Sequence, residues 1–331
     1  MGALAYDFSR PDRTAAGTPV LVALAVDRFE VFDPGTSQPP PPPATAPARI
    51  DLPAFSSLSR GEHGRLVAHI REHIAAGDIY QANLSQRFQV PWKGSGLALY
   101  HHLRWLSPAP FSGYLRAPGF EIVSASPERL LLVDGARLST RPIAGTRPRS
   151  ADPRTDDAYA AELLLSEKER AEHLMLLDLA RNDLGKVAVL GSVQVDEMMT
   201  VERYSHVRHI VSNVSARLAP GCDVFDALLS MFPGGTITGV PKIRCMEILD
   251  ALEPVPRGFY TGSLFYATPS GRLDANILIR SAVVEGGLVT FHARGGIVAD
   301  SDPGFEYAET LHKAEGMRVA LEAAMEAPEA G

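Results

Sequence analysis

The sequence predicts an α+β fold built on large, mainly antiparallel sheets. Short segments in which apolar and polar residues alternate are the first sign, because period-two alternation is typical of half-buried strands. The second sign is their order along the chain, since these segments cluster and only a few long stretches with helical spacing separate them. Strict alternation of strands with helices would indicate a parallel sheet, so the clustering favours antiparallel pairing.

The first 58 residues are predicted to precede the main domain. Residues 1–38 contain one apolar run, at 20–26, and a short alternating piece at 29–32, and we interpret them as the remnant of a longer N-terminal region. Five consecutive prolines follow at 39–43. Proline has no N–H group for a strand ladder and favours polyproline II, which makes 39–58 a proline-rich linker. The main domain is expected to occupy 59–331.

Helices and strands are then expected in order along the main domain. Apolar residues recur at three- and four-residue steps after Ser59, and Gly77 is placed to cap the C-terminus of that helix. Ser166 and Glu169 have the spacing of a capping box at the start of a long helix that Gly185 ends. Further helices are expected after Asp223, after Pro241, and after Ser301 or Asp302. Strands are expected at 84–90, 122–124, 130–133, 138–143, 193–195, 207–214, 261–266, 277–284 and 289–293.

Composition excludes several classes of protein. The chain has 331 residues, of which 45% are hydrophobic and 21% charged, so it can bury a large core and is too apolar for disorder. It has no run of about 18 apolar residues, so no membrane segment is expected. The 32 basic and 39 acidic residues give a net charge of −7, which argues against a nucleic-acid partner. Two cysteines, Cys222 and Cys245, make neither a disulfide framework nor a zinc site, and without a recognisable signal peptide a cytoplasmic location is expected.

Two predicted helices carry carboxylates at the same spacing. Glu169 and Glu172 lie three residues apart on one helix, as do Glu306 and Glu309 on another, so each pair projects from one helix face. Two such faces opposed would form a site for a hard divalent cation such as magnesium, which takes oxygen ligands from one or two carboxylates. Solvated faces of two surface helices are the alternative interpretation, because charged helix faces are common.

Three further features have side chains suited to binding or proton transfer. Arg280 lies in the apolar strand expected at 277–284, where a guanidinium needs either a ligand carboxylate or an internal acidic partner. The glycine-rich turn 232–242 contains Thr236 and Lys242 and precedes a helix, so its backbone amides can hold an anion. This turn does not match the phosphate-binding loop, so a nucleotide is not implied. His209 can act as an acid or base near neutral pH, although a single strand histidine is more often structural.

Eight motifs follow one another between residue 59 and the C-terminus. They are Gly77-Asp-Ile-Tyr-Gln81-Ala-Asn-Leu-Ser-Gln-Arg87-Phe, Ser124-Ala-Ser-Pro-Glu128-Arg, Pro142-Ile-Ala144-Gly-Thr146-Arg-Pro-Arg149, Glu169-Arg-Ala-Glu172-His, Asp178-Leu-Ala-Arg-Asn-Asp183-Leu-Gly, the glycine turn before Lys242, Asp300-Ser-Asp-Pro, and Glu306-Tyr-Ala-Glu309-Thr. Together they closely resemble the chorismate-binding enzymes, above all component I of aminodeoxychorismate synthase and of anthranilate synthase. The resemblance implies an α+β fold in which two large, mainly antiparallel sheets are sandwiched among helices, with 59–331 as the catalytic domain.

The resemblance also implies a magnesium site and a role for each polar group. Magnesium lies between the two carboxylate-bearing helices in that family, with Glu172 and Glu309 as the matching ligands and Glu169 and Glu306 beside them. The residues that match substrate contacts are Gln81, Thr146, Tyr260 and Arg280, the last two toward the enolpyruvyl carboxylate of chorismate, and Gly296 and Lys313 near the ring carboxylate. The residues that match catalytic positions are Glu128, His209, Thr236 and Lys242. Proton donors around the departing 4-hydroxyl group assist a poor leaving group.

The residue at position 81 bears on the nucleophile. Relatives that add water to the ring carry a lysine base where this chain has Gln81, and ammonia needs no deprotonation before it attacks. The resemblance therefore implies an aminating enzyme and argues against isochorismate synthesis. The residues from Gln81 to Leu84, the glycine turn and the segment 260–263 are more similar to aminodeoxychorismate synthase than to anthranilate synthase.

Three features depart from the family pattern. Ala144 stands where many aminodeoxychorismate synthases have a lysine proposed to add covalently to the ring, which argues against covalent catalysis. Arg294 occupies a usually small position beside the ring-carboxylate loop, where a bulky cation repacks the loop or adds a carboxylate contact. The N-terminal part is also shorter than in typical relatives and lacks much of the segment that holds the tryptophan feedback site of anthranilate synthases, so feedback inhibition is not expected.

The resemblance thus implies an enzyme that converts chorismate and ammonia to 4-amino-4-deoxychorismate for 4-aminobenzoate and folate biosynthesis. Ammonia is expected from a separate glutamine amidotransferase subunit, component II, since this chain does not contain the cysteine-histidine-glutamate apparatus of such a domain. Two alternatives stay open: anthranilate synthase component I, and a non-catalytic relative that only binds chorismate or a partner.

Overall fold

The computed structural model describes residues 1–9, 19–26, 49–203 and 207–326. The chain divides into two compact units. Unit 1 comprises Met1–Pro127, Thr238–Leu264 and Leu278–Gly331, and unit 2 comprises Glu128–Ile237 and Phe265–Ile277. The proline run 39–43 of the predicted linker lies outside the described residues, as do 10–18 and 27–38 of the predicted N-terminal remnant.

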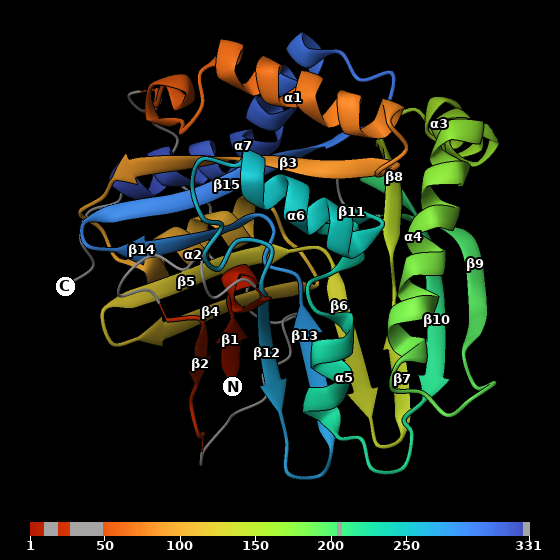
Figure 1. The fold of residues 1–331 in the computed structure, drawn as a ribbon. Coiled ribbons are helices and arrows are strands. Elements are labelled where there is room, and N and C mark those ends of the chain that lie inside the picture. Colours follow the sequence, from red (N-terminus) through yellow and green to blue (C-terminus); the bar gives the residue numbers. More distant parts are fainter. Residues whose placement is uncertain (10–18, 27–48, 204–206, 327–331) are drawn as a thin grey trace. The chain divides into compact units, whose positions relative to one another are not determined.

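Unit 1 is built on a six-stranded antiparallel sheet (Figure 1). Its strands, in spatial order, are β11 (Gly239–Val240), β3 (Gln81–Pro91), β15 (Leu288–Ile297), β14 (Ser281–Glu285), β5 (Phe120–Ser126) and β4 (Phe111–Ala117). Residues directly opposite each other on antiparallel strands share a face. The register of β3 and β15 therefore sends Phe88 and Phe291 to one face of the sheet, and Asn83 and Gly296 to the other.

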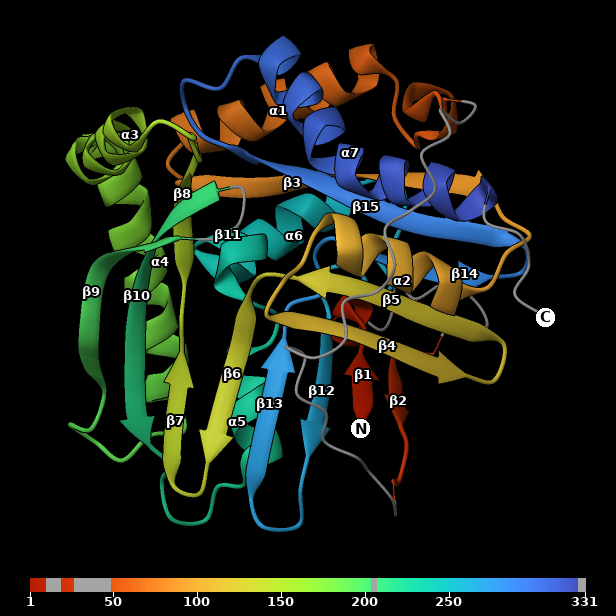
Figure 2. The same ribbon diagram turned by 180° about the vertical axis from the view of Figure 1, so that it is seen from behind.

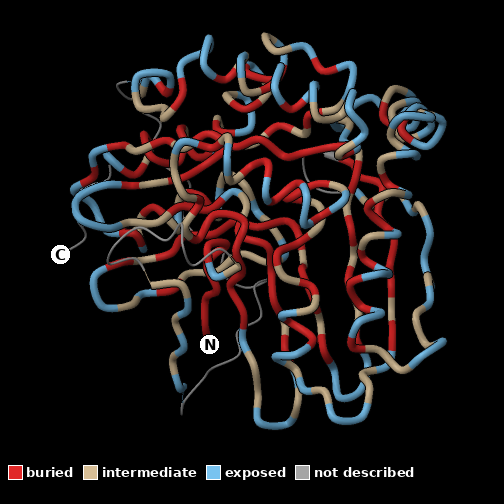
Figure 3. Tube along the Cα trace, in the orientation of Figure 1, coloured by how far each residue is buried: buried red, intermediate tan, exposed pale blue. Residues whose placement is uncertain are grey.

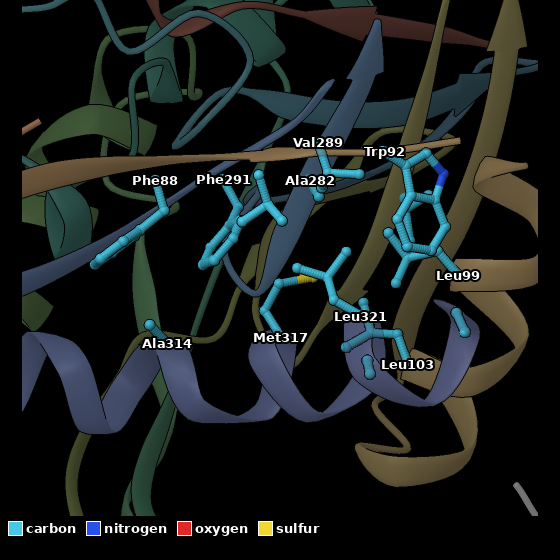
Figure 4. Packing of buried hydrophobic residues seen from close by; sticks show 14 of the residues in the cluster. Phe88, Trp92, Leu99, Leu103, Ala282, Val289, Phe291, Ala314, Met317 and Leu321 are labelled. Atoms are coloured by element: carbon cyan, nitrogen blue, oxygen red, sulfur yellow. The ribbon is translucent and has the colours of Figure 1, made fainter. Parts of the chain in front are cut away.

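The apolar face of this sheet packs against α1 (Arg60–Ala75), α2 (Gly96–Leu106) and α7 (Pro303–Glu326). Figure 4 shows Phe88 and Phe291 side by side on the sheet, with Met317 and Leu321 of α7 directed toward it. The two phenyl rings stack with their centroids 5.1 Å apart. Each fully buried side chain of this size contributes about 1.5–3 kcal/mol to folding. This packing holds the helices on one face and leaves polar side chains of β3 and β15 on the other.

Local sequence signals account for the helices of unit 1. The helix expected after Ser59 is α1, and Ser59 exchanges both hydrogen bonds of a capping box with Glu62. The helices expected after Pro241 and Asp302 are α6 (Lys242–Leu252) and α7. No helix among the described residues is long and apolar enough to span a lipid bilayer.

The N-terminal residues that the structure describes belong to unit 1. β1 (Gly2–Leu4) pairs with β2 (Leu21–Ala23), and the 3-10 helix η1 (Tyr6–Ser9) follows β1. Ala3 and Ala5 are buried, and Figure 3 shows the chain next to the N-terminus in the colour of buried residues. The end of the predicted linker forms a second short helix, η3 (Leu52–Phe55), whose Leu52 is buried in the same core as Phe88.

Unit 2 contains a second antiparallel sheet. Its strands, in spatial order, are β12 (Ser263–Ala267), β13 (Arg272–Asn276), β6 (Arg129–Asp134), β7 (Arg137–Thr140), β10 (Val207–Arg217) and β8 (Ile143–Pro148), and β9 (Gln194–Arg203) also pairs with β10. The helices α4 (Glu167–Gly185) and α5 (Val224–Met231) pack on one face of this sheet, as Figures 1 and 2 show from opposite sides. The helix α3 (Pro153–Leu165) packs against β8. The long helix expected between Ser166 and Gly185 is confirmed as α4.

Two predicted strands are interrupted in the structure. The segment 138–143 is divided between β7, which ends at Thr140, and β8, which begins at Ile143. The single strand expected at 277–284 is wrong, because β13 ends at Asn276 in unit 2 and β14 begins at Ser281 in unit 1. Arg280, just before β14, has a left-handed backbone with φ of 50°. The chain leaves one sheet and enters another here. The alternation of apolar and polar residues does not predict where a strand passes from one sheet to another.

Candidate active site

His209 lies on β10 of unit 2, where the neighbouring strand β8 holds its ring. Its Nδ1 atom is 2.9 Å from the carbonyl oxygen of Gly145 and 3.1 Å from Thr146 Oγ1. A carbonyl oxygen only accepts hydrogen bonds, so Nδ1 carries a proton and Nε2 is the nitrogen that exchanges protons with other groups. The structure therefore brings together two predicted site residues, His209 and Thr146, and gives the buried imidazole a fixed orientation.

Gly145 allows this corner of unit 2 to close, because its φ is +63° and two side chains approach its α-carbon. An added Cβ would lie 2.7 Å from Leu163 Cδ1 and 2.9 Å from Glu169 Oε2. Glu169 Oε1 also pairs with Arg147 Nη1 at 3.2 Å. Arg147 therefore neutralises part of the charge on Glu169 in this structure.

Glu128 and Thr236 form a second contact within unit 2. Thr236 Oγ1 donates a hydrogen bond to Glu128 Oε1 at 2.7 Å, and Glu128 is buried. Thr236 lies in the short helix η4 (Gly235–Ile237), where a Cβ on Gly235 would lie only 2.4 Å from Leu179 Cδ2 of α4. Close packing against α4 thus accounts for this glycine. Anion binding by the amides of the turn stays a prediction.

The acidic pair of unit 1 lies at the start of α7. Glu306 is buried; its Oε1 accepts a hydrogen bond from Ser301 Oγ at 2.6 Å, and its Oε2 has no hydrogen-bond partner among the described residues. Burial raises the pKa of Glu306, and the nearby Glu309 carboxylate adds to that rise while the Ser301 bond opposes it. Glu309 pairs with Lys313 Nζ at 2.5 Å. One buried carboxylate oxygen of the pair therefore has no hydrogen-bond donor among the described residues, although the charge of Lys313 lowers the pKa of Glu306 to some extent.

These features are the ones that a divalent cation would stabilise. A buried carboxylate oxygen without a donor is costly, and an oxygen-preferring cation supplies what it lacks. Gly295 leaves room for this carboxylate, since an added Cβ would lie 2.9 Å from Glu306 Oε2. Across the ranges that the structure describes, no three His, Cys, Asp or Glu side chains come together as a ready-made metal site. The four predicted carboxylates form two pairs, Glu169 and Glu172 in unit 2 and Glu306 and Glu309 in unit 1.

Gln81, Asn83 and Gly296 lie together on the polar face of β3 and β15. Gly296 is directly opposite Asn83, and a Cβ on Gly296 would lie 2.8 Å from Gln81 Nε2. Any side chain at position 296 would therefore displace the Gln81 amide. Arg294, two residues earlier on the same face of β15, donates a hydrogen bond to Asn83 Oδ1. The structure thus places the predicted contacts Gln81 and Gly296 side by side.

Tyr260 is held by an aromatic stack in unit 1. Its ring lies almost parallel to the His292 imidazole, with the centroids 4.8 Å apart and an angle of 9° between the planes. Burial raises the pKa of Tyr260 to about 12 and lowers the pKa of His292 well below its usual value. At neutral pH the phenol is therefore protonated and the imidazole neutral, so Tyr260 keeps its O–H group as a hydrogen-bond donor.

A buried ion pair completes the edge of β3 next to these residues. β11 pairs with only the first two residues of β3. Beyond it, Ser85 N donates to Glu253 Oε1 at 2.9 Å and Arg257 Nη2 donates to the Asn83 carbonyl at 2.7 Å. Glu253 and Arg257 pair with each other at 2.7 Å, so their side chains take the place of a strand and satisfy the buried backbone of β3.

Arg280 has no internal acidic partner in the part of the chain that the structure describes. Its side chain is exposed, and its carbonyl oxygen accepts a hydrogen bond from Ala125 N at 3.1 Å. The internal salt bridge considered for this arginine is therefore wrong for the described residues. Water can solvate an exposed guanidinium, so the binding of a ligand carboxylate by Arg280 stays a prediction.

The two lysines predicted for the site lie on different helices of unit 1. Lys242 is the first residue of α6 and is buried. Lys313 lies on α7, where its pairing with Glu309 holds the ammonium group beside the acidic pair. Both lysines belong to unit 1.

The sequence reasoning missed several residues that shape this region. Asn83 was within reach of a pattern, because it lies two residues after Gln81 and alternation places both on one strand face. No local pattern links Tyr260 to His292, and none shows that Glu253 and Arg257 bind the backbone of β3. These contacts join segments that are far apart in the sequence.

Comparison with known proteins adds an independent finding. Residues 18–319 match the family model described as chorismate binding enzyme. The chain is 47% identical over 268 residues to the anthranilate synthase component I-like protein of Synechocystis sp., covering 80% of this chain and 55% of that protein. It is 48% identical over 256 residues to aminodeoxychorismate synthase component 1 of Bacillus subtilis, covering 77% of this chain and 54% of that protein.

A solved structure is similar over most of the chain. The crystal structure of anthranilate synthase component I from Streptococcus pneumoniae TIGR4 superposes with a TM-score of 0.81 at 30% identity, covering 96% of this chain and 80% of that one. The chain spans just over half the length of the two curated relatives named above.

Proposed function

The chain belongs to the family of chorismate-binding enzymes, and on that premise we propose that it is component I of an aminodeoxychorismate synthase. Its reaction would convert chorismate and ammonia to 4-amino-4-deoxychorismate and water, for 4-aminobenzoate and folate biosynthesis. The observation that carries the aminating part of this proposal is the neutral Gln81 amide packed against Gly296. An amide offers no base for deprotonating water, whereas ammonia attacks without one.

Substrate binding would rest on the polar groups of unit 1. Arg280, which has no acidic partner among the described residues, would bind the enolpyruvyl carboxylate together with the protonated Tyr260 hydroxyl. A guanidinium and a phenol are both donors, and a carboxylate accepts from both. The ring carboxylate would lie toward the Gly296 amide and Lys313.

Magnesium is the cation that we propose for the two acidic pairs. Glu172 and Glu309 would be its ligands, with Glu169 and Glu306 beside them. When bound, magnesium supplies positive charge to a carboxylate of the substrate. The buried, unpartnered Glu306 oxygen supports a cation at this position.

The proton transfers would fall to side chains of unit 2. Departure of the 4-hydroxyl group as water needs one proton, and the attacking ammonia releases one after its C–N bond forms. His209 is suited to deliver a proton from Nε2, because Nδ1 is tied to the Gly145 carbonyl and the ring cannot turn away. Thr236 and Glu128, joined by a 2.7 Å hydrogen bond, would orient the leaving group or the nucleophile.

The buried alanine on β8 favours direct displacement of the hydroxyl group over a covalent intermediate. Ala144 has no nucleophilic atom and is enclosed beside the Gly145–Thr146 corner. Because residue 144 offers no nucleophile, we propose a mechanism in which ammonia attacks the bound substrate itself. Lys242, the lysine that we assign to the catalytic set, lies on α6 of unit 1.

Ammonia would come from a separate glutamine amidotransferase subunit; the relatives' names, which number them as component I or 1, are consistent with a second component. Free ammonium at high concentration should replace that subunit in the assay. The test is to incubate the purified chain with chorismate, ammonium and magnesium, and then add the lyase that releases 4-aminobenzoate. Formation of 4-aminobenzoate supports the proposal, and anthranilate fluorescence without 4-aminobenzoate contradicts it.

Anthranilate synthase component I is the second candidate, and two observations favour it. The similar crystal structure is named anthranilate synthase component I, and a relative at 47% identity is named anthranilate synthase component I-like protein. Ala144 also matches the residue that anthranilate synthases have at this position. Rescue of a tryptophan auxotroph but not of a 4-aminobenzoate auxotroph by the gene would select this candidate. Calorimetry that shows chorismate binding without turnover would select a non-catalytic relative.

A further inference from the structure

Arg294 places a second guanidinium on the polar face of unit 1, beside residues that we assign to substrate binding. It shares the β15 face with His292 and Gly296, because alternate residues of a strand point the same way. Within the described part of the chain, its hydrogen bond runs to β3, from Nη1 to Asn83 Oδ1. Arg294 therefore lies between Tyr260, which stacks on His292, and the Gln81–Gly296 contact.

The charge of Arg294 is not neutralised by the chain itself. Asn83 is a neutral amide, and no carboxylate of the described residues forms an ion pair with Arg294. Two buried arginines of unit 1 have acidic partners: Arg257 pairs with Glu253, and Arg318 pairs with Glu315 and Glu322. A half-buried guanidinium with only a neutral partner has hydrogen-bond donors left for an anion.

Arg294 also fixes the orientation of the Asn83 side chain. A guanidinium only donates, so Asn83 must present Oδ1 to it and turn Nδ2 the other way. The described residues supply no acceptor for this Nδ2 group. The corner thus combines two sets of donors, from Arg294 and Asn83, next to the protonated Tyr260 hydroxyl and the Gln81 amide, and all of them suit an anionic oxygen.

We propose that Arg294 is a specificity-determining residue that binds a carboxylate of the substrate and holds Asn83 so that its amide nitrogen donates to the same ligand. This inference rests on the proposed function, because it concerns the same site and an anionic chorismate-like substrate. It adds a cationic contact to those of Arg280 and Lys313 and selects for substrates with a carboxylate at this corner.

The test is calorimetric binding of chorismate without ammonium, so that no turnover occurs. Arg294→Gln removes the charge but retains a donor for Asn83, and Arg294→Lys retains the charge without the forked geometry. A hydrogen bond to a charged group predicts about 10- to 100-fold weaker binding by Arg294→Gln, with Arg294→Lys in between. Arg104→Gln on α2, which removes a half-buried arginine on the helix-covered side of the sheet, should bind like the wild type.

A second measurement separates binding from a merely structural role. Chorismate affinity should fall less steeply with added salt in Arg294→Gln than in the wild type, because one ionic contact is missing. Equal affinity and equal salt dependence in the two proteins would overturn the inference. Arg294-dependent chorismate binding without any aminated product would leave it intact and would count against the proposed function alone, whereas a wild-type chain that does not bind chorismate would overturn both.

Discussion

Replacement of Gly145 by alanine tests the close packing around His209. Gly145 has φ of +63°, and a Cβ there would lie 2.7 Å from Leu163 Cδ1 and 2.9 Å from Glu169 Oε2. Gly135 is a matched control in the same unit, because its φ is +59° and an added Cβ would meet nothing within 4 Å. Alanine at either position pays the left-handed backbone cost of about 1–2 kcal/mol.

Only Gly145→Ala adds the cost of moving its neighbours. Displacing two packed side-chain ends costs about 1–3 kcal/mol, so we expect the free energy of unfolding of Gly145→Ala to lie below that of Gly135→Ala by this amount. The carbonyl of residue 145 also accepts the hydrogen bond that orients His209. The kcat of Gly145→Ala should therefore fall roughly tenfold or more, while Gly135→Ala keeps wild-type activity.

Urea denaturation and steady-state kinetics on the two variants provide the comparison. We expect Gly145→Ala to be both less stable and less active than Gly135→Ala. Equal losses of stability in both variants, with wild-type activity in Gly145→Ala, would refute the claim that this glycine is required for the site.

Two further predictions concern the stability of unit 1. Glu253→Gln leaves the buried Arg257 charge without its acidic partner and should lower the free energy of unfolding by about 3–5 kcal/mol. Glu315→Gln removes a partly exposed carboxylate and leaves Arg318 paired with Glu322, so it should cost under about 1 kcal/mol, and comparable losses in the two variants would contradict this prediction. Burial raises the pKa of Asp7 to about 6, so ionising it should cost the folded state up to about 3 kcal/mol as pH rises from about 4 to about 7. Asp7→Asn keeps an acceptor for Gly258 N. This variant should be more stable than the wild type above pH 6 and equal to it near pH 4. A stability difference that does not change with pH would contradict the raised pKa of Asp7.

Local sequence signals predicted α1, α4, α5, α6 and α7 but missed α2 and α3, and they did not predict the paths between sheets. The capping-box spacing of Ser166 and Glu169 predicted the start of α4, where the Ser166 side chain accepts a hydrogen bond from Glu169 N. The break before Ser281 was not foreseen, because the segment from Ile277 to Val284 is apolar on both sides of it. Its cause is the passage of the chain from one sheet to another, which depends on distant strands.

The same distinction applies to the site. Spacing alone found each acidic pair, since residues three apart on a helix share a face, and the buried Glu306 supports a functional interpretation of one pair. The Thr146–His209 contact joins residues 63 positions apart, and no spacing rule predicts it. Only resemblance to a known family placed these residues in one site before their contact was visible.

The most direct test of the account measures the binding of manganese, a spectroscopic substitute for magnesium, in the presence of chorismate. Glu172 and Glu309 belong to different units, so a cation held by both should be lost when either one is changed. We expect Glu172→Gln and Glu309→Gln, each folded like the wild type by thermal melting, to bind manganese at least about tenfold more weakly. Wild-type manganese affinity in either variant would contradict the claim that both acidic pairs hold one cation.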